Sequence, residues 1–360
     1  MAAKVGFGHE VLNADYTAKP YFAPLMYRII LFLFVGLLFL SCTDNAHAPN
    51  VSAIDIHITE GRFENSFFSG DSILTAAKTD SLETAYGSFL QDFLYGILNV
   101  PKQQDSALEY ASNFKKAYTP LWQDASKKFA DMSVYNKELI KALQYVHYYF
   151  PDYVLPASFI TFIGPATGYS NILTQAGIAV GLQLYMGQDY PMYQEGYFRE
   201  VYPDYLHRRF SPEYIIPDAI KNIVNEIVQP PSADHSLLAG MIDAGKKIYV
   251  AKLLLPTTAD SLLIGYTAQQ LKDCKAGERQ IWDFFLKNNL LFESDPLRIK
   301  TYLTDGPNTA ELGPGSPGNI GLFLGWQIVN KWLTSHSNTD LKDLLQKPAR
   351  DMYAESKYKP

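Results

Sequence analysis

The segment Asn225–Gln229, which reads NEIVQ, has the residue spacing of a hydrolytic zinc site. In the motif H-E-x-x-H, two histidines one helical turn apart bind the metal and the glutamate acts as a general base. Here Asn225 and Gln229 take the two histidine positions around Glu226, and amides are poor zinc ligands beside neutral imidazole. Three interpretations stay open: a solvated polar helix face that includes Asn222, a vestigial peptidase-like site, and a working metal site. The first two agree with our prediction of no catalytic residue and no bound metal.

A third ligand of such a site would come from the following helix. Asp243 lies on that helix and could ligate, but Lys246, one turn later, would oppose a cation. The vestigial zincin-like site would therefore consist of Asn225, Glu226, Gln229 and Asp243. The six histidines after residue 42 do not pair at ligand spacing, and the chain holds no G-x-S-x-G, P-loop or dinucleotide motif. We accordingly predict no cofactor.

An apolar run near the N-terminus predicts export. Residues 29–40 (IILFLFVGLLFL) follow Arg28. The run is too short to span a bilayer comfortably and matches the core of a secretory signal. Ser41 and Cys42 come next, an arrangement that resembles the lipobox of bacterial lipoproteins, in which the cysteine thiol receives a diacylglyceryl group. With two or more acyl chains, Cys42 would hold the protein stably on a membrane.

The export signal divides the chain into three predicted parts. Residues 1–41 are a signal peptide whose true start is Met26, because residues 1–25 contain no apolar run. Residues 42–53 are a polar, lipidated tether without a hydrophobic pattern. Residues 54–360 are one globular domain.

The composition fits a packed, acidic domain. Hydrophobic residues make up 47% of the chain and charged residues 19%, which predicts a core and not disorder. Without residues 1–41, 28 basic and 35 acidic residues remain, a formal charge of −7. This charge argues against nucleic acid as a partner and against electrostatic binding to a membrane surface. Apart from Cys42, the only cysteine is Cys274, for which we predict a partly buried free thiol without a disulfide.

The apolar periodicity predicts an α+β fold, mostly helical, with a small β-sheet in a single domain. Strands are expected over residues 52–59, 157–164 and 176–186, of which the last two could form a hairpin with the first beside it. Helices are expected over residues 71–100, 104–118, 120–132, 135–150, 217–229, 237–254, 267–288, 320–333 and 339–355.

Helix-capping residues and glycines give further predictions for the second half of the chain. Thr267 is expected to cap one helix, and Asp234 or Ser236 another. Gly321 and Gly325 stand one turn apart in the apolar helix 320–333. Because a glycine has no side chain, this face should approach a neighbouring helix closely, as packing within a soluble domain.

Several short stretches carry a family resemblance: residues 210–218 (FSPEYIIPD), 238–255, 264–267 (IGYT), 280–282 (QIW), 316–318 (SPG), 325–329 (GWQIV) and 355–360 (ESKYKP). In this combination the chain resembles the gliding-motility lipoprotein GldB family of Bacteroidota from about residue 54 to its end. That family is distantly similar to zinc-peptidase-like domains with H-E-x-x-H, which implies a degenerate zincin-like fold. Ala244 stands where the resemblance would place an acidic residue, a further argument against peptidase activity.

The resemblance implies a cell-envelope protein, lipid-anchored to the inner or outer membrane and with protein partners in the envelope. We expect a non-catalytic component that supports gliding motility or its associated secretion apparatus. One alternative is a zinc-dependent peptidase with an atypical or vestigial site. Another is a binder of peptide or glycan in a groove over that site, and the metal content of the pure protein would separate the peptidase from the other two.

Overall fold

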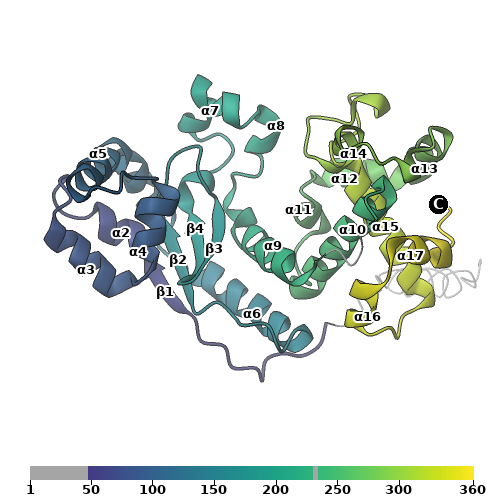
Figure 1. The fold of residues 1–360 in the computed structure, drawn as a ribbon, viewed down its shortest axis with the longest axis horizontal. Helices are drawn as coiled ribbons and strands as arrows, with labels where there is room; N and C mark the ends of the chain where they lie inside the picture. The colour runs from purple at the N-terminus through teal and green to yellow at the C-terminus, as the bar shows by residue number, and fades with distance from the viewer. Residues whose placement is uncertain (1–47, 230–233) are drawn as a thin grey trace, which may run out of the picture. The chain divides into compact units, whose positions relative to one another are not determined.

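The computed structural model describes residues 48–229 and 234–360. The predicted signal peptide with its start at Met26, the lipidation site Cys42 and the first part of the tether lie outside the described residues. Asn50–Pro360 form one compact unit, coloured from purple to yellow in Figure 1. Its many helices and single small sheet confirm the predicted α+β class.

One four-stranded mixed sheet lies between the α2–α5 group and the helices α6 and α9 (Figure 1). The spatial order is β1-β2-β4-β3, in which β1 pairs with β2 and β2 with β4 in parallel, while β3 and β4 are antiparallel. The two central strands are almost wholly buried, as expected for a sheet covered on both faces. The strands are β1 (Thr59–Arg62), β2 (Ser158–Phe162), β3 (Asn171–Thr174) and β4 (Gly177–Gly181).

The strand predictions are only partly confirmed. Residues 157–164 contain β2 and residues 176–186 contain β4, but these strands pair in parallel, so the expected hairpin is wrong. The reason is β3, which the apolar pattern does not reveal because it is short and half-buried. It turns the chain back before β4. Residues 52–58 alternate like a strand but pack irregularly against the core, and β1 begins only at Thr59.

The helices of the first half differ from the predicted pattern in three ways. The helix expected over residues 71–100 is broken at Gly87 into Ala76–Tyr86, Phe89–Gln91 and a π-helical turn, and a short helix before it was not predicted. The sequence predicts two helices that meet at Pro120, whereas the structure has the single helix α5. Proline removes one backbone hydrogen bond, but buried residues on both sides, such as Phe114 and Leu121, hold the helix on one core. The helices are α2 (Phe63–Phe68), α3 (Ala76–Tyr86), α4 (Phe89–Gln91), a π-helical segment (Asp92–Ile97), α5 (Gln104–Lys128) and α6 (Ser133–Tyr149).

The second half is helical and confirms the predicted caps. The Ser236 hydroxyl accepts a hydrogen bond at the start of α10, and Thr267 forms a capping box with Gln270 at the start of α12. Two expected long helices are each broken, at Gly277 and at Pro348. The helices are α7 (Gly196–Val201), α8 (Asp204–His207), α9 (Ile215–Ile227), α10 (Leu237–Leu254), α11 (Asp260–Ile264), α12 (Ala268–Ala276), α13 (Glu278–Lys287), α14 (Pro296–Leu303), α15 (Ile320–Ser335), α16 (Leu341–Gln346) and α17 (Ala349–Ser356).

The close helix contact predicted from Gly321 and Gly325 is confirmed at the crossing of α15 with α10. A Cβ atom added to Gly325 would lie 1.7 Å from the carbonyl oxygen of Met241. One added to Gly245 on α10 would lie 2.4 Å from the carbonyl carbon of Gly325. The two backbones therefore touch, and this contact fixes α10 in the second of two apolar clusters, which also buries the free thiol of Cys274.

Candidate functional site

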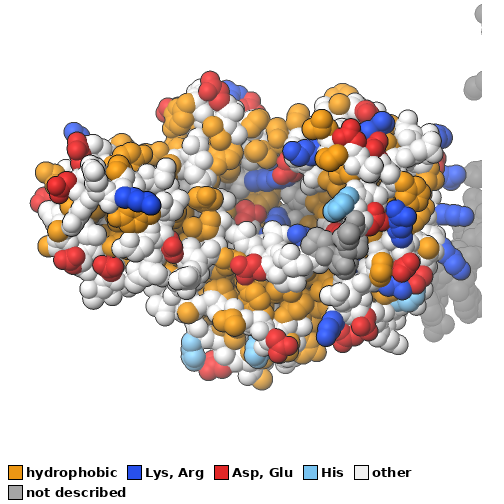
Figure 2. Space-filling view, viewed as in Figure 1, with side chains coloured by type: hydrophobic (Ala, Val, Ile, Leu, Met, Phe, Trp, Pro, Cys, Tyr) orange, Lys and Arg blue, Asp and Glu red, His pale blue; other side chains and the backbone are white. Residues whose placement is uncertain are grey.

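A cavity of about 600 Å³ is lined by α9, α10, α11 and the segments that follow α8 and α14. Figure 2 shows this face of the molecule hollowed between α8 and α14, with basic and acidic side chains inside the hollow. We call it the charged cavity. Its charged and amide side chains are Arg209, Asp218, Lys221, Asn225, Asp243, Lys247, Asp305 and Asn319.

Helix α9 turns its polar edge to the charged cavity because its apolar edge is buried. Ile220 and Ile223 are fully buried in the core around the sheet. Since residues three and four apart share one side of a helix, Asp218, Lys221 and Asn225 lie together on the other edge. The pair one turn apart that faces the cavity is thus Lys221 and Asn225.

Two ammonium groups stand at the wall that α9 and α10 form. Lys247 Nζ donates to Asn225 Oδ1 at 2.9 Å. Lys221 Nζ lies 3.5 Å from Asp218 Oδ1 and 3.3 Å from the carbonyl oxygen of Leu262. The amide oxygen that could serve a cation as ligand is therefore already engaged by a lysine.

Asp243 lines the same cavity and is paired with the next turn of α10. Its Oδ1 lies 3.7 Å from Nζ of Lys246, which also donates to the carbonyl oxygens of Leu345 and Lys347 at 3.1 and 2.7 Å. Burial raises the pKa of Asp243 and lowers the pKa of Lys246, against their mutual attraction. The Lys246 side chain is only 1% exposed. Its hydrogen bonds to the carbonyl groups of Leu345 and Lys347 connect α10 to the end of α16.

A bidentate ion pair closes another side of the cavity. Arg209 Nη1 and Nη2 donate to the two carboxylate oxygens of Asp305 at 2.6 and 2.9 Å, and Nη2 also donates to the Gly265 carbonyl at 3.0 Å. Burial alone would raise the pKa of Asp305, but the bonds from Arg209 outweigh burial and lower it. The planar fork of arginine fits this two-point contact.

The structure does not bring the four predicted site residues together. Asn225 and Asp243 both line the charged cavity. Helix α9 ends at Ile227, so Gln229 lies beyond the helix, and its Nε2 donates to the carbonyl oxygens of Asn225 and Glu226 at 2.7 and 3.2 Å. The Glu226 carboxylate accepts a hydrogen bond of 2.6 Å from the Tyr153 hydroxyl.

The side chains of the charged cavity do not fit a zinc ion. Zinc takes imidazole, thiolate or carboxylate ligands, whereas the Asn225 amide is bonded to one ammonium group and the Asp243 carboxylate is paired with another. Within the described ranges 48–229 and 234–360, no three His, Cys, Asp or Glu side chains form a group that could hold a metal ion. The arrangement suits the binding of a charged or polar group.

Most residues of this cavity were not predicted from the sequence. Lys221 and Asp218 could have been found, because they continue the polar edge of α9 four and seven positions before Asn225. Arg209 and Asp305 gave no local signal, since 96 positions separate them in the chain.

Comparisons with known proteins identify the family. No helix within the described residues is long and apolar enough to span a bilayer. No curated protein and no solved structure matches the chain significantly. The sequence profile of the family described as gliding motility protein GldB matches residues 44–360, most of the chain. The chain therefore belongs to the gliding motility protein GldB family.

Proposed function

We propose that this protein is a lipid-anchored, non-catalytic component of the cell envelope that supports gliding motility or its associated secretion apparatus. Membership of the GldB family supports the link to gliding motility. The observation that carries the non-catalytic part is the 2.9 Å contact between Lys247 Nζ and Asn225 Oδ1. An ammonium at that distance repels a divalent cation from the same oxygen.

Metal-dependent hydrolysis needs a bound water whose pKa the metal has lowered. Lys247 occupies the amide oxygen of Asn225, and Lys246 is paired with the carboxylate of Asp243, which disfavours a metal at these two groups. Glu226, the candidate base, instead accepts a hydrogen bond from Tyr153. Without a metal-bound water, Glu226 has no nucleophile to activate.

Metal analysis and complementation test the non-catalytic role together. Protein purified without chelators should contain no stoichiometric zinc. Glu226→Gln should restore spreading of a gliding host that lacks its own family member, as should the control Tyr153→Phe, which removes the same hydrogen bond and keeps the carboxylate. About one zinc per chain, with loss of spreading in Glu226→Gln but not in Tyr153→Phe, would instead establish the zinc-dependent peptidase.

The proposed anchor is Cys42, which follows the apolar residues 29–40. Cys42→Ala should leave the protein unlipidated and unprocessed, as measured by incorporation of labelled palmitate and by the mass of the chain. A gene that begins at Met26 should restore full function. Normal lipid labelling of the Cys42→Ala protein would refute the anchor, and function only from a start at Met1 would refute the assigned signal peptide.

We also propose protein partners in the envelope. Cross-linking in intact cells, followed by mass spectrometry of the complexes, should recover the wild-type protein with envelope proteins. Recovery of this chain alone under the same conditions would contradict a supporting role in a larger apparatus.

A further inference from the structure

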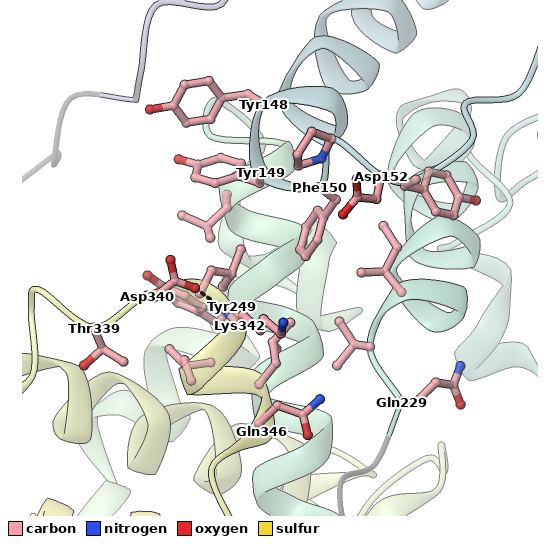
Figure 3. A pocket seen from close by; sticks show the side chains of 18 residues that line it. Tyr148, Tyr149, Phe150, Asp152, Gln229, Tyr249, Thr339, Asp340, Lys342 and Gln346 are labelled. Carbon is pink, nitrogen blue, oxygen red and sulfur yellow. Dashed lines mark hydrogen bonds between the residues drawn. The ribbon is translucent and has the colours of Figure 1, made fainter.

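A second cavity, of about 1060 Å³, lies apart from the charged cavity and is lined by the ends of α6 and α9, the last turns of α10, and α16. We call it the aromatic groove. Figure 3 shows Tyr148 and Tyr149 one above the other on one side, Gln229 on the opposite side, and Phe150 between them. Its volume is at the upper end of the roughly 300–1,000 Å³ of small-molecule sites.

Aromatic rings form the walls of the groove. Tyr148 and Tyr149 meet edge to face with ring centroids 4.9 Å apart. Phe150 follows them in the chain, and Tyr249 reaches the groove from α10. Tyr148 is 51% exposed, although burying a tyrosine ring is normally favourable. The groove therefore offers flat apolar surfaces that the described residues, 48–229 and 234–360, leave uncovered.

Three hydroxyl groups of the groove are free to bind a ligand. Within the described part of the chain, the hydroxyl groups of Tyr148, Tyr149 and Tyr249 have no hydrogen-bond partner. Burial, with the neighbouring tyrosines, raises the pKa of Tyr149 to about 12, so its hydroxyl keeps its proton at neutral pH. Tyr153, by contrast, already donates to Glu226.

The charged side chains of the groove and the secondary structure of its walls exclude some classes of ligand. Its charged side chains are Asp152, Asp340 and Lys342, and the Asp340 carboxylate is occupied by the backbone N–H of Lys342 at 2.8 Å. A strongly charged ligand is thus not favoured. An extended peptide binds by adding to a strand edge, and none of the described residues that line the groove belongs to a strand.

We propose that the aromatic groove binds a neutral oligosaccharide of two or three pyranose rings. A pyranose ring has an apolar C–H face, which packs on an aromatic ring, and hydroxyl edges, which pair with free tyrosine and amide groups. The walls supply both kinds of surface in one place, from Tyr148, Tyr149, Phe150 and Tyr249 with the Gln346 amide and the amide oxygen of Gln229. This site goes beyond the proposed envelope function and does not depend on it.

Calorimetric titration of the full chain, purified from its host in a detergent without a sugar headgroup, tests the proposal. The probes are chitotriose and cellotriose, which differ in their acetamido groups. Binding of either supports the site, and binding of chitotriose alone adds recognition of the acetamido group. Tyr148→Ala and Tyr249→Ala should each weaken binding by about tenfold. The control Tyr110→Ala, at a ring of similar exposure (49%) outside the groove, should leave binding unchanged.

Three results would overturn the proposal. One is the absence of saturable binding by both sugars up to millimolar concentration. Another is equal weakening by Tyr148→Ala and Tyr110→Ala. The last is binding of N-acetyl-tetra-alanine amide, a neutral peptide, without binding of either sugar, which would make the groove a peptide site.

Discussion

Replacing Gly325 with alanine should separate the two helices that organise the second half of the protein. The new methyl group would lie 1.7 Å from the carbonyl oxygen of Met241 and 2.3 Å from its carbonyl carbon. Both atoms belong to the backbone of α10, so no side-chain rotation can relieve the clash. Helix α15 must then move outward by roughly 2 Å to restore ordinary contact.

The loss of stability in Gly325→Ala follows from the packing contacts that this shift weakens. A gap of 0.5–1 Å already forfeits a quarter to a half of each dispersion contact, and overpacking of this kind costs up to about 3 kcal/mol. The higher helix propensity of alanine offsets about 1 kcal/mol of this loss of stability. We therefore expect Gly325→Ala to lower the free energy of unfolding by about 2 kcal/mol, or the melting temperature by about 4–8 °C.

Urea unfolding followed by far-ultraviolet circular dichroism measures the effect. The midpoint should fall by roughly 0.7 M for a slope near 3 kcal/mol/M. Gly96→Ala is the matched control, because Gly96 is exposed in a helical segment and a Cβ there meets nothing within 4 Å. It should be neutral or stabilise by up to about 1 kcal/mol. Equal midpoints for Gly325→Ala and wild type would refute the close approach of the two helices.

Three further outcomes follow from buried or paired groups. Asp305→Asn should cost about 1 kcal/mol at pH 7. Because the pKa of Asp305 is lowered from 3.8, the difference in urea midpoint should be complete above about pH 5 and disappear as the pH falls through the lowered pKa; a constant difference would contradict the ion pair. Lys246→Met should lower the free energy of unfolding by about 3 kcal/mol in the same assay, because it leaves Asp243 and two carbonyl groups unpaired. The control Lys247→Met should lower it by less than about 1 kcal/mol. Equal losses for the two variants would contradict the structural role of the buried Lys246 side chain. Burial raises the pKa of Cys274 from 9.0 to about 12, so iodoacetamide should alkylate it about a thousandfold more slowly in the native than in the unfolded protein, and equal rates would show an open thiol.

The charged cavity and the aromatic groove share two helices. Asn225 on α9 and Lys247 on α10 face the charged cavity, while the end of α9 and Tyr249 on α10 face the groove. The helix crossing at Gly325 holds α10 in place. A ligand that moved α10 in one cavity would therefore alter the wall of the other.

The sequence by itself determined the features that depend on neighbours in the chain. The periodicity of apolar residues gave the α+β class and most helix positions, because one buried face repeats every turn of a helix. Ser236 and Thr267 could be identified as caps, since a capping hydroxyl bonds within three residues of itself. The spacing of Gly321 and Gly325 predicted a close helix contact, but it could not predict which helix they contact.

Only the tertiary structure decided which elements meet. The parallel pairing of β2 with β4 depends on the short strand β3, which carries too few residues for a pattern. The end of α9 at Ile227 removed Gln229 from the helix on which its predicted role depended. The walls of both cavities join residues that are distant in the chain, such as Asn225 with Lys247, 22 positions apart, or Tyr148 with Gln346, 198 positions apart. Such contacts form when apolar faces that are distant in the chain pack together, so the spacing of residues along the sequence does not predict them.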